Sequence, residues 1–393
     1  MNWFFAFRRA IAWHCVFLGL LTTGCGSGET PVAQDAVVPA EKDAPSERQA
    51  AGESPPVSEA TPQEQESADG DVEPQGASGL EFELFAELTG HADEVSSLAF
   101  SPDGTLLAVG DHADDVKLWD VATQRETVSL AGHNKEKVKF GLSKDVTTVA
   151  FAPNGKSFAS GSYDGSVKFW DVANGSETNS FSGHKPLEFV RTIAFSPDGT
   201  MLASGGDDDT VILWNVATGD KIATVESIDP ESPGDVRSVA FSPDGGLLAI
   251  AGYDNRVRFW DVATKQVVKT LEPYEGHVMT VAFSPDGKSL ASGHWDKTAI
   301  LWDVASGEVR HQFRDLGAYV DCVAFAPNGK VLAASNGDGL VTVWDVSAAA
   351  ELQTLQPHDD GVDAIAFSPD GKLFAASAGT SVKLWKLKPP QSP

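Results

Sequence analysis

The sequence predicts an all-β fold built from seven copies of one unit of roughly forty residues. Each copy begins with an apolar strand, passes through a turn reading SPDG or APNG to a second strand and a further turn, and closes with a third strand that ends on Trp. Successive tryptophans stand 41 to 51 residues apart, which is the period of a propeller blade. They are Trp119, Trp170, Trp214, Trp260, Trp302, Trp344 and Trp385.

The local chemistry of each copy agrees with this fold class. Segments such as VSSLAF, TLLAVG and VKLW are short and rich in β-branched and aromatic residues, as strands are. Pro followed by Asp and Gly suits a tight turn. Asp or Asn follows the first six tryptophans, and this ending together with the SPDG-type turn resembles the WD-repeat family of β-propellers over about residues 81–388. The resemblance implies a ring of seven four-stranded antiparallel blades.

The ends of the repeat region predict how the ring closes. Most copies have a fourth strand after the Trp, but only KLKPPQSP follows Trp385, and its prolines cannot donate to a ladder. Residues 81–88, EFELFAEL, alternate apolar and polar side chains before the first copy begins. We therefore expect residues 81–88 to pair in the last blade, which hides both sheet edges.

The segment before the repeats has a different composition. Residues 26–80 contain no aromatic side chain, seven prolines and twelve acidic residues, so burial cannot offset the entropy of ordering them. The sequence predicts a disordered, acidic, proline-rich linker at 26–80, a propeller at 81–388 and a short tail at 389–393.

The first 25 residues have the pattern of an export signal. Arg8 and Arg9 precede an apolar run of about eleven residues, which is too short for a membrane span and typical of a secretory signal. LTTGC at 21–25 resembles the bacterial lipoprotein box, which implies lipidation of Cys25. A cleaved signal without lipid and an uncleaved anchor are the alternatives. Each predicts an extracytoplasmic location in a bacterial cell envelope or periplasm, with membrane attachment through the lipid on Cys25 in the lipoprotein case.

Charge and cysteine content restrict the partners. A formal net charge of -27 argues against nucleic acid and anionic membrane surfaces, because both attract basic patches. Cys322 is the cysteine left within the repeats, so an intramolecular disulfide there is not expected, and core packing is its expected role. We expect a monomeric propeller without a cofactor or metal. The acidic triplet Asp207, Asp208 and Asp209 lacks the ligand spacing of a calcium loop.

Two copies combine the residue types of a hydrolase triad. The resemblance implies instead a structural hydrogen-bond relay (the His, Ser, Asp and Trp of one blade). We expect no enzyme, because the sequence contains no complete set of catalytic residues. These relay residues are His133, Ser160, Asp164 and Trp170 in copy two, and His184, Ser204, Asp208 and Trp214 in copy three. Other copies depart from the pattern: Ala113 and Gly379 replace the Asp in copies one and seven, and Tyr274 and Leu316 take the His position in copies five and six.

The resemblance also implies where a partner docks. Three positions per blade converge on one face: those before and after the Val that opens the first strand, and the one before the turn Asp. Aromatic, Met and Arg residues, which carry interface energy, gather at these positions in copies two to six. They are Tyr163, Phe189, Arg191, Arg237, Tyr253, His277, Met279, Trp295 and Tyr319.

These positions lead to three hypotheses. The first is a protein or peptide site on one side of the face, in which Arg191 and Arg237 engage a carboxylate. In the second, the same residues only seal the central channel. The third is an enzyme or small-ligand site at the channel mouth, which fold alone does not exclude.

Overall fold

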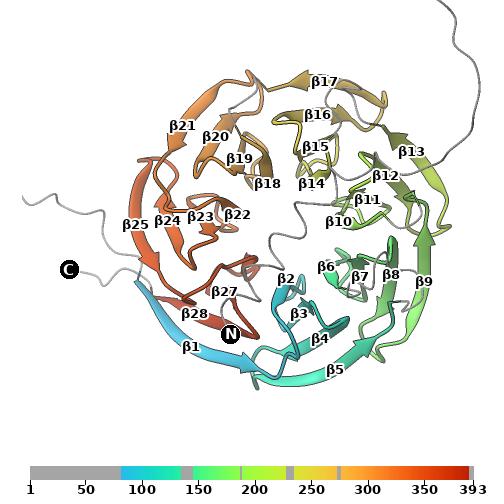
Figure 1. Ribbon diagram of the computed structural model, residues 1–393, viewed down its shortest axis with the longest axis horizontal. Coiled ribbons are helices and arrows are strands. Elements are labelled where there is room, and N and C mark those ends of the chain that lie inside the picture. Colours follow the sequence, from blue (N-terminus) through green and yellow to red (C-terminus); the bar gives the residue numbers. More distant parts are fainter. Residues whose placement is uncertain (1–80, 134–144, 186–187, 227–233, 272–275, 389–393) are drawn as a thin grey trace, which may run out of the picture. The chain divides into compact units, whose positions relative to one another are not determined.

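The computed structural model describes residues 81–133, 145–185, 188–226, 234–271 and 276–388. The predicted signal at 1–25, the linker at 26–80 and the tail at 389–393 lie outside these residues and stay predictions. Within the described part the chain forms seven antiparallel four-stranded sheets arranged as a ring (Figure 1). This confirms the predicted seven-bladed propeller. The described part contains no helix long and apolar enough to cross a lipid bilayer.

Each blade is ordered from the centre of the ring outwards, as Figure 1 shows. The innermost strands are β2 (Val95–Phe100), β6 (Val146–Phe151), β10 (Val190–Phe195), β14 (Val236–Phe241), β18 (Val278–Phe283), β22 (Val320–Phe325) and β26 (Ile365–Phe367). The second strands are β3 (Leu106–Asp111), β7 (Ser157–Ser162), β11 (Met201–Gly206), β15 (Leu247–Gly252), β19 (Ser289–His294), β23 (Val331–Asn336) and β27 (Leu373–Ala378).

Two further strands complete every blade. The third strands, which carry the repeat Trp, are β4 (Asp115–Asp120), β8 (Ser166–Asp171), β12 (Val211–Asn215), β16 (Val257–Asp261), β20 (Ala299–Asp303), β24 (Val341–Asp345) and β28 (Ser381–Lys388). The outer strands are β5 (Arg125–Ala131), β9 (Glu177–Ser182), β13 (Lys221–Val225), β17 (Gln266–Thr270), β21 (Val309–Phe313), β25 (Ala350–Leu355) and β1 (Glu81–Thr89).

The SPDG turn shows why its residues recur. In the first copy, Ser101 Oγ donates to Asp103 Oδ1 at 2.6 Å, and the backbone N–H of Thr105 donates to the same oxygen at 3.0 Å. Gly104 has a φ of 71°, a left-handed conformation that glycine adopts without strain. The Asp side chain thus satisfies the turn's donors while the Gly lets the chain reverse.

The hydrophobic core lies between neighbouring blades. One cluster joins Val116 and Leu118 of blade one to Val146, Phe158 and Trp170 of blade two. Second strands are almost wholly buried, whereas an outer strand such as β9 is mostly exposed. Because each blade completes the core of its neighbours, the ring depends on closure.

Strand β1 provides that closure. It pairs antiparallel with β28, so the last sheet has the order β1-β28-β27-β26. Phe82 packs into the cluster between blades six and seven, and Leu88 into the cluster between blades seven and one. The predicted pairing of residues 81–88 in the last blade is confirmed, and one strand connects three consecutive blades.

Candidate functional site

A backbone irregularity orients one set of predicted site residues. In six blades the register between the first two strands shifts immediately after the opening Val, for example between Val190 and Thr192 and between Val236 and Ser238. The residues at the shift, Arg191 and Arg237 among them, have no cross-strand partner. A bulge of this kind turns a side chain out of the ordinary pleat.

Three pairs of rings connect successive blades on the predicted face. The ring centroids of Tyr163 and Phe189 are 4.1 Å apart, and those of Tyr253 and His277 are 4.6 Å apart. Trp295 and Tyr319 stack at 4.4 Å with only 9° between their planes. All six residues are partly exposed. The structure therefore brings together the aromatic residues of blades two to six that the sequence singled out.

Arg191 is held by groups of its own chain. Its Nε and Nη2 donate to the two carboxylate oxygens of Asp207 at 2.6 Å each, and its Nη1 donates to the Tyr163 hydroxyl at 2.6 Å. The guanidinium also lies over the rings of Tyr163 and Phe189. The expectation that Arg191 is available to a partner's carboxylate is wrong, because a bidentate pair with Asp207 already neutralises it.

Arg237 differs from Arg191. Its guanidinium carbon lies 5.3 Å from the Tyr253 ring centroid, and its buried Nε has no hydrogen-bond partner among the described residues. Asp235 stands in the same region. Burial, with Asp207 nearby, raises the pKa of Asp235 well above its usual range, although Arg191 and Arg237 oppose the shift. Unlike Arg191, Arg237 therefore has a guanidinium N–H, at Nε, that donates no hydrogen bond to a described residue.

Two other predicted residues have partners inside the fold. Met279 is only 7% exposed, so its predicted place on an open face is wrong; it belongs to the buried core. His277 is partly exposed, and its Nδ1 lies 2.7 Å from the carbonyl oxygen of Tyr253. A count of positions from the opening Val does not distinguish these two environments.

The remaining part of the mouth, at blades seven, one and two, is acidic. His112 Nδ1 lies 3.0 Å from Asp145 Oδ2. A ring nitrogen of His112 and one oxygen from each of Glu94 and Asp363 lie within 4.8 Å of one another. Burial lowers the pKa of His112, but the carboxylates of Asp145, Asp363 and Glu94 outweigh this effect and raise it.

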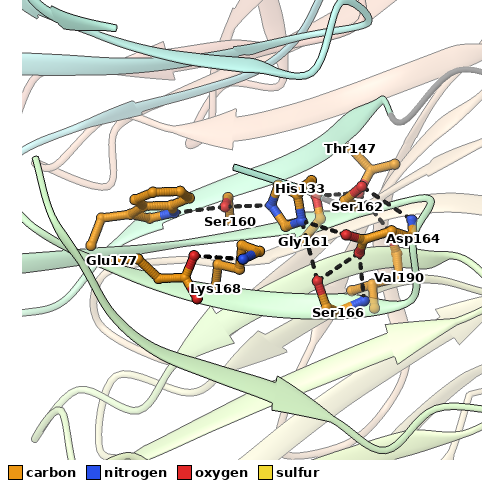
Figure 2. Close-up of polar contacts among 11 residues, drawn as sticks. His133, Thr147, Ser160, Gly161, Ser162, Asp164, Ser166, Lys168, Glu177 and Val190 are labelled. Carbon is orange, nitrogen blue, oxygen red and sulfur yellow. Dashed lines mark hydrogen bonds and ion pairs between the residues drawn. The ribbon is translucent and has the colours of Figure 1, made fainter. Parts of the chain in front are cut away.

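The relay residues of blades two and three form continuous hydrogen-bond chains. Trp170 Nε1 donates to Ser160 Oγ at 2.9 Å, Ser160 Oγ lies 2.8 Å from His133 Nε2, and His133 Nδ1 lies 3.2 Å from Asp164 Oδ2 (Figure 2). The chain of blade three has the same order, from Trp214 through Ser204 and His184 to Asp208.

Burial bears on what these chains can do. Ser160 and Ser204 are each 0% exposed, and each hydroxyl also accepts from a Trp N–H. A hydrolase nucleophile must reach its substrate, which these hydroxyls cannot. Burial raises the pKa of Asp208, but its hydrogen bond with His184 and further donors prevail and lower it to about 2. The arrangement favours the structural relay.

Residues that the sequence analysis missed replace the relay in other blades. In blade one, His91 Nδ1 lies 3.0 Å from Asp111 Oδ2, so Asp111 does what Ala113 cannot. In blade six, Asn336 donates to the carbonyl of Leu316, the residue at the His position. Both replacements sit eight residues before the repeat Trp. That shared spacing is the signal that could have identified them.

Blades four and five use further solutions. Arg258 of β16 pairs with Asp254 and is buried where copy four has no His. In blade five, His294 Nε2 lies 2.7 Å from Ser292 Oγ, which also accepts from Trp302 Nε1 at 2.7 Å. His294 therefore supplies the imidazole of this blade. The sequence analysis had placed Tyr274, which lies outside the described residues, at the His position.

His294 makes stability depend on pH. Burial lowers its pKa from 6.5 to about 4, so between these values the unfolded chain binds more protons than the folded one. We expect the free energy of unfolding to fall by up to about 3 kcal/mol as the pH drops from 6.5 to 4. His294→Gln should flatten this dependence in denaturant titrations, and His311→Gln on the partly exposed strand β21 is the control. Equal slopes for both variants would contradict the assignment.

Cys322 is not a reactive group. It lies among the partly buried residues that pack against the core between blades six and seven, and burial raises the pKa of its thiol to about 11. The thiolate required for nucleophilic chemistry is therefore scarce at neutral pH.

Comparison with known proteins gives two family matches. Residues 81–264 match the family described as "Nucleolar protein 10-like, N-terminal domain". Residues 265–303, 308–345 and 349–386 match "WD domain, G-beta repeat".

Three curated relatives illustrate the similarity. The chain is 34% identical over 27% of its length to "Periodic tryptophan protein 2 homolog" of Schizosaccharomyces pombe. It is 38% identical over 25% of its length to "WD repeat-containing protein VIP3" of Arabidopsis thaliana, and 33% identical over 22% to "Pre-mRNA-processing factor 19 homolog 2" of the same plant. The matched regions span 11%, 32% and 15% of those relatives.

These matches contradict the predicted location. The relatives come from eukaryotes, and the first family carries a nucleolar description, whereas the sequence analysis expected a bacterial cell envelope. That expectation is corrected: it depended on the composition of residues 1–25, which lie outside the described part. No match shows lipidation of Cys25. What the ring and the family matches establish together is a seven-bladed β-propeller that contains WD repeats within residues 265–386.

Proposed function

We propose that this propeller is a scaffold that binds a protein or peptide on the side of the mouth formed by blades two to six. The observation that carries the proposal is the set of three ring pairs, Tyr163 with Phe189, Tyr253 with His277 and Trp295 with Tyr319. Each pair spans two blades and remains partly exposed. Aromatic side chains fixed in this way offer contact area at little cost in conformational entropy.

Arg237 supplies the polar anchor of the proposed site. The side chain is partly exposed and its guanidinium lies over the Tyr253 ring, so a carboxylate of the partner can approach its charge. Residues that only sealed the channel would gain more from a paired arginine such as Arg191. This difference between the two arginines supports a binding role for the region.

The relatives are consistent with protein partners. One is named as a pre-mRNA-processing factor, and a further relative, from Mus musculus, is named as part of a chromatin assembly factor. Because the chain matches less than a third of the length of these relatives, we carry over only the class of function, which is binding to other proteins. The burial of the Ser hydroxyls supports a binding module over a hydrolase, and we further propose that the propeller acts as a monomer without nucleic acid.

Capture experiments with the full chain test the proposal. We expect Trp295→Ala and Arg237→Glu to weaken binding of a captured partner by roughly tenfold or more, because both remove central contacts. Val268→Ala, on outer strand β17 and 56% exposed in the native chain, should bind like wild type. Partners from an extract of the source cells are crosslinked, identified and titrated against each variant, whose melting temperatures confirm folding. Normal capture by both face variants would refute the site.

A further inference from the structure

Junction pairs line the mouth where neighbouring blades meet. A junction pair consists of the residue before the turn Asp, or its replacement, in one blade and the residue before the opening Val of the next. The side chains of several junction pairs are in contact: His112 with Asp145, Tyr163 with Phe189, Tyr253 with His277, and Trp295 with Tyr319. At the junction of blades three and four the equivalent residues are Asp207 and Asp235. The repeat therefore brings two carboxylates together where other junctions have stacked rings.

The backbone holds both aspartates in the geometry of the repeat. The N–H of Asp207 donates to the carbonyl of Phe189 at 3.0 Å, and the carbonyl of Asp235 accepts from the N–H of Tyr253 at 3.1 Å. The equivalent bond in blade five, from Trp295 to His277, is 2.9 Å long. The inner strands that follow the two junction positions, β10 and β14, are neighbours around the centre of the ring (Figure 1).

Two guanidinium groups serve these carboxylates unequally. Arg191 donates from Nε and Nη2 to both oxygens of Asp207. Arg237, two residues after Asp235, lies over the ring of Tyr253 instead. No hydrogen bond or ion pair joins the carboxylate of Asp235 to another of the described residues. Asp207 thus has a fixed counter-ion, whereas Asp235 has a neighbouring cation with which it does not pair.

The surroundings of Asp235 favour its protonated form. Burial contributes most, and together with the charges of Asp207 and Asp209 it raises the pKa of Asp235 to about 7, against the attraction of Arg191 and Arg237. Near neutral pH this carboxyl group is therefore present in both forms. The protonated form can donate a hydrogen bond, whereas the ionised form can only accept one.

We propose that Asp235 takes up a proton when a carboxylate of the partner docks at Arg237, so that capture strengthens as the pH falls. An ionised Asp235 repels the incoming carboxylate, whereas a protonated one removes the repulsion and offers an O–H donor beside the guanidinium. This inference rests on the proposed scaffold function, because it requires a partner carboxylate at Arg237, and it adds the regulation of that site.

The direction of the pH dependence follows from linkage. The charge of a docked carboxylate raises the pKa of Asp235 further in the complex than in the free chain. Below about pH 7 both states carry the proton, and the affinity is constant. Above about pH 7 the complex binds more protons than the free chain, so the affinity falls as the pH rises.

The binding test uses the full-length chain and two rhodamine-labelled probes, hexaglutamate and hexaglutamine. The carboxylates of hexaglutamate stay ionised between about pH 6.5 and 8.5. We expect wild type to prefer hexaglutamate at pH 6.5 and to lose roughly fivefold or more of that affinity at pH 8.5. Asp235→Asn keeps an N–H donor at every pH, so its affinity should change by less than about twofold over this range.

Two matched variants control for other causes. Asp315→Asn removes the same charge from an exposed position with a φ of 59°, which Asn tolerates, and should keep the wild-type pH ratio. His277→Gln removes the imidazole that stacks on Tyr253, and should also keep the ratio at whatever affinity remains.

Unfolding provides a test that needs no partner. Because the folded chain keeps the proton of Asp235 to a higher pH than the unfolded chain does, ionisation of Asp235 costs stability as the pH rises from about 4 to 7. In denaturant titrations of the full chain, Asp235→Asn should therefore gain stability relative to wild type across this range. A difference that is constant with pH would show that Asp235 has no unusual protonation and would overturn the inference.

Three binding outcomes would also overturn it. Wild type that binds hexaglutamate no better than hexaglutamine has no carboxylate site, and a pH ratio that persists in Asp235→Asn belongs to another group. A ratio lost in His277→Gln would assign the proton to the imidazole. If Trp295→Ala impairs capture of the cellular partner while Asp235→Asn keeps the wild-type pH ratio, the scaffold function stands and this inference fails.

Discussion

Leu88→Ala should lower the stability of the whole ring by about 2–5 kcal/mol, whereas Leu84→Ala on the same strand should change it by less than about 0.5 kcal/mol. Leu88 is 1% exposed and packs between blades seven and one; Leu84 is 55% exposed. The two substitutions remove the same atoms from strand β1, so their difference measures burial at the closure. Thermal and denaturant unfolding of the full chain checks it.

Deletion of residues 81–88 should have a larger effect. It removes Phe82 and Leu88 together with the ladder to β28, and it exposes the apolar surfaces that blades six, seven and one bury against them. We expect the melting temperature to fall by more than about 10 °C, from the summed loss of two core side chains. An unchanged melting temperature would mean that the ring stays closed without its outer strand.

The closing strand was predictable because it depends on alternation and on a missing element. EFELFAEL has apolar residues at alternate positions, which is typical of a half-buried strand, although a register shift between Leu84 and Ala86 leaves Leu84 exposed. The prolines after Trp385 exclude an outer strand there. The first three strands of each copy followed in the same way from the Trp and the SPDG-type turn. The Trp and the SPDG-type turn recur in every copy, so the strands predicted in one copy support those predicted in the next.

The individual contacts of the site were less predictable. Equivalent sequence positions hold Arg191, which makes three hydrogen bonds to two residues, and Arg237, whose Nε has no hydrogen-bond partner among the described residues. The difference depends on neighbours from adjacent blades, such as Tyr163 and Asp207. Likewise, Asp111 and His294 compensate for a missing relay residue from a position where blade three has Gly206. Periodicity reports which residues share a position, but not which side chains meet across strands.

The relay leads to the second large effect. Ser204→Ala should destabilise the propeller by about 2–4 kcal/mol, because it leaves the buried donor Trp214 Nε1 and the buried His184 Nε2 without the hydroxyl that joins them. Ser335 is the matched control: it is also 0% exposed on a second strand, but its Oγ has no hydrogen-bond partner among the described residues. Ser335→Ala should be neutral or stabilising in the same denaturant titration. Similar losses for both variants would mean that the relay contributes nothing beyond packing.

Blade one offers the reciprocal experiment. Val109 occupies the position of the relay Ser, and His91 Nε2 and Trp119 Nε1 are both buried without a partner among the described residues. Val109→Ser would place a hydroxyl between them. Val109→Ala removes the same two methyl groups but adds no hydroxyl. In an ordinary core Ser is no better than Ala, because its hydroxyl loses hydration. Here we expect Val109→Ser to be more stable than Val109→Ala by about 1–2 kcal/mol, since the hydroxyl would give both Trp119 Nε1 and His91 Nε2 a hydrogen-bond partner. If Val109→Ala is as stable as Val109→Ser or more stable, the geometry of blade one cannot accommodate a Trp–Ser–His–Asp relay. The His91–Asp111 pair would then be a substitute for the relay and not a relay that lacks only its Ser.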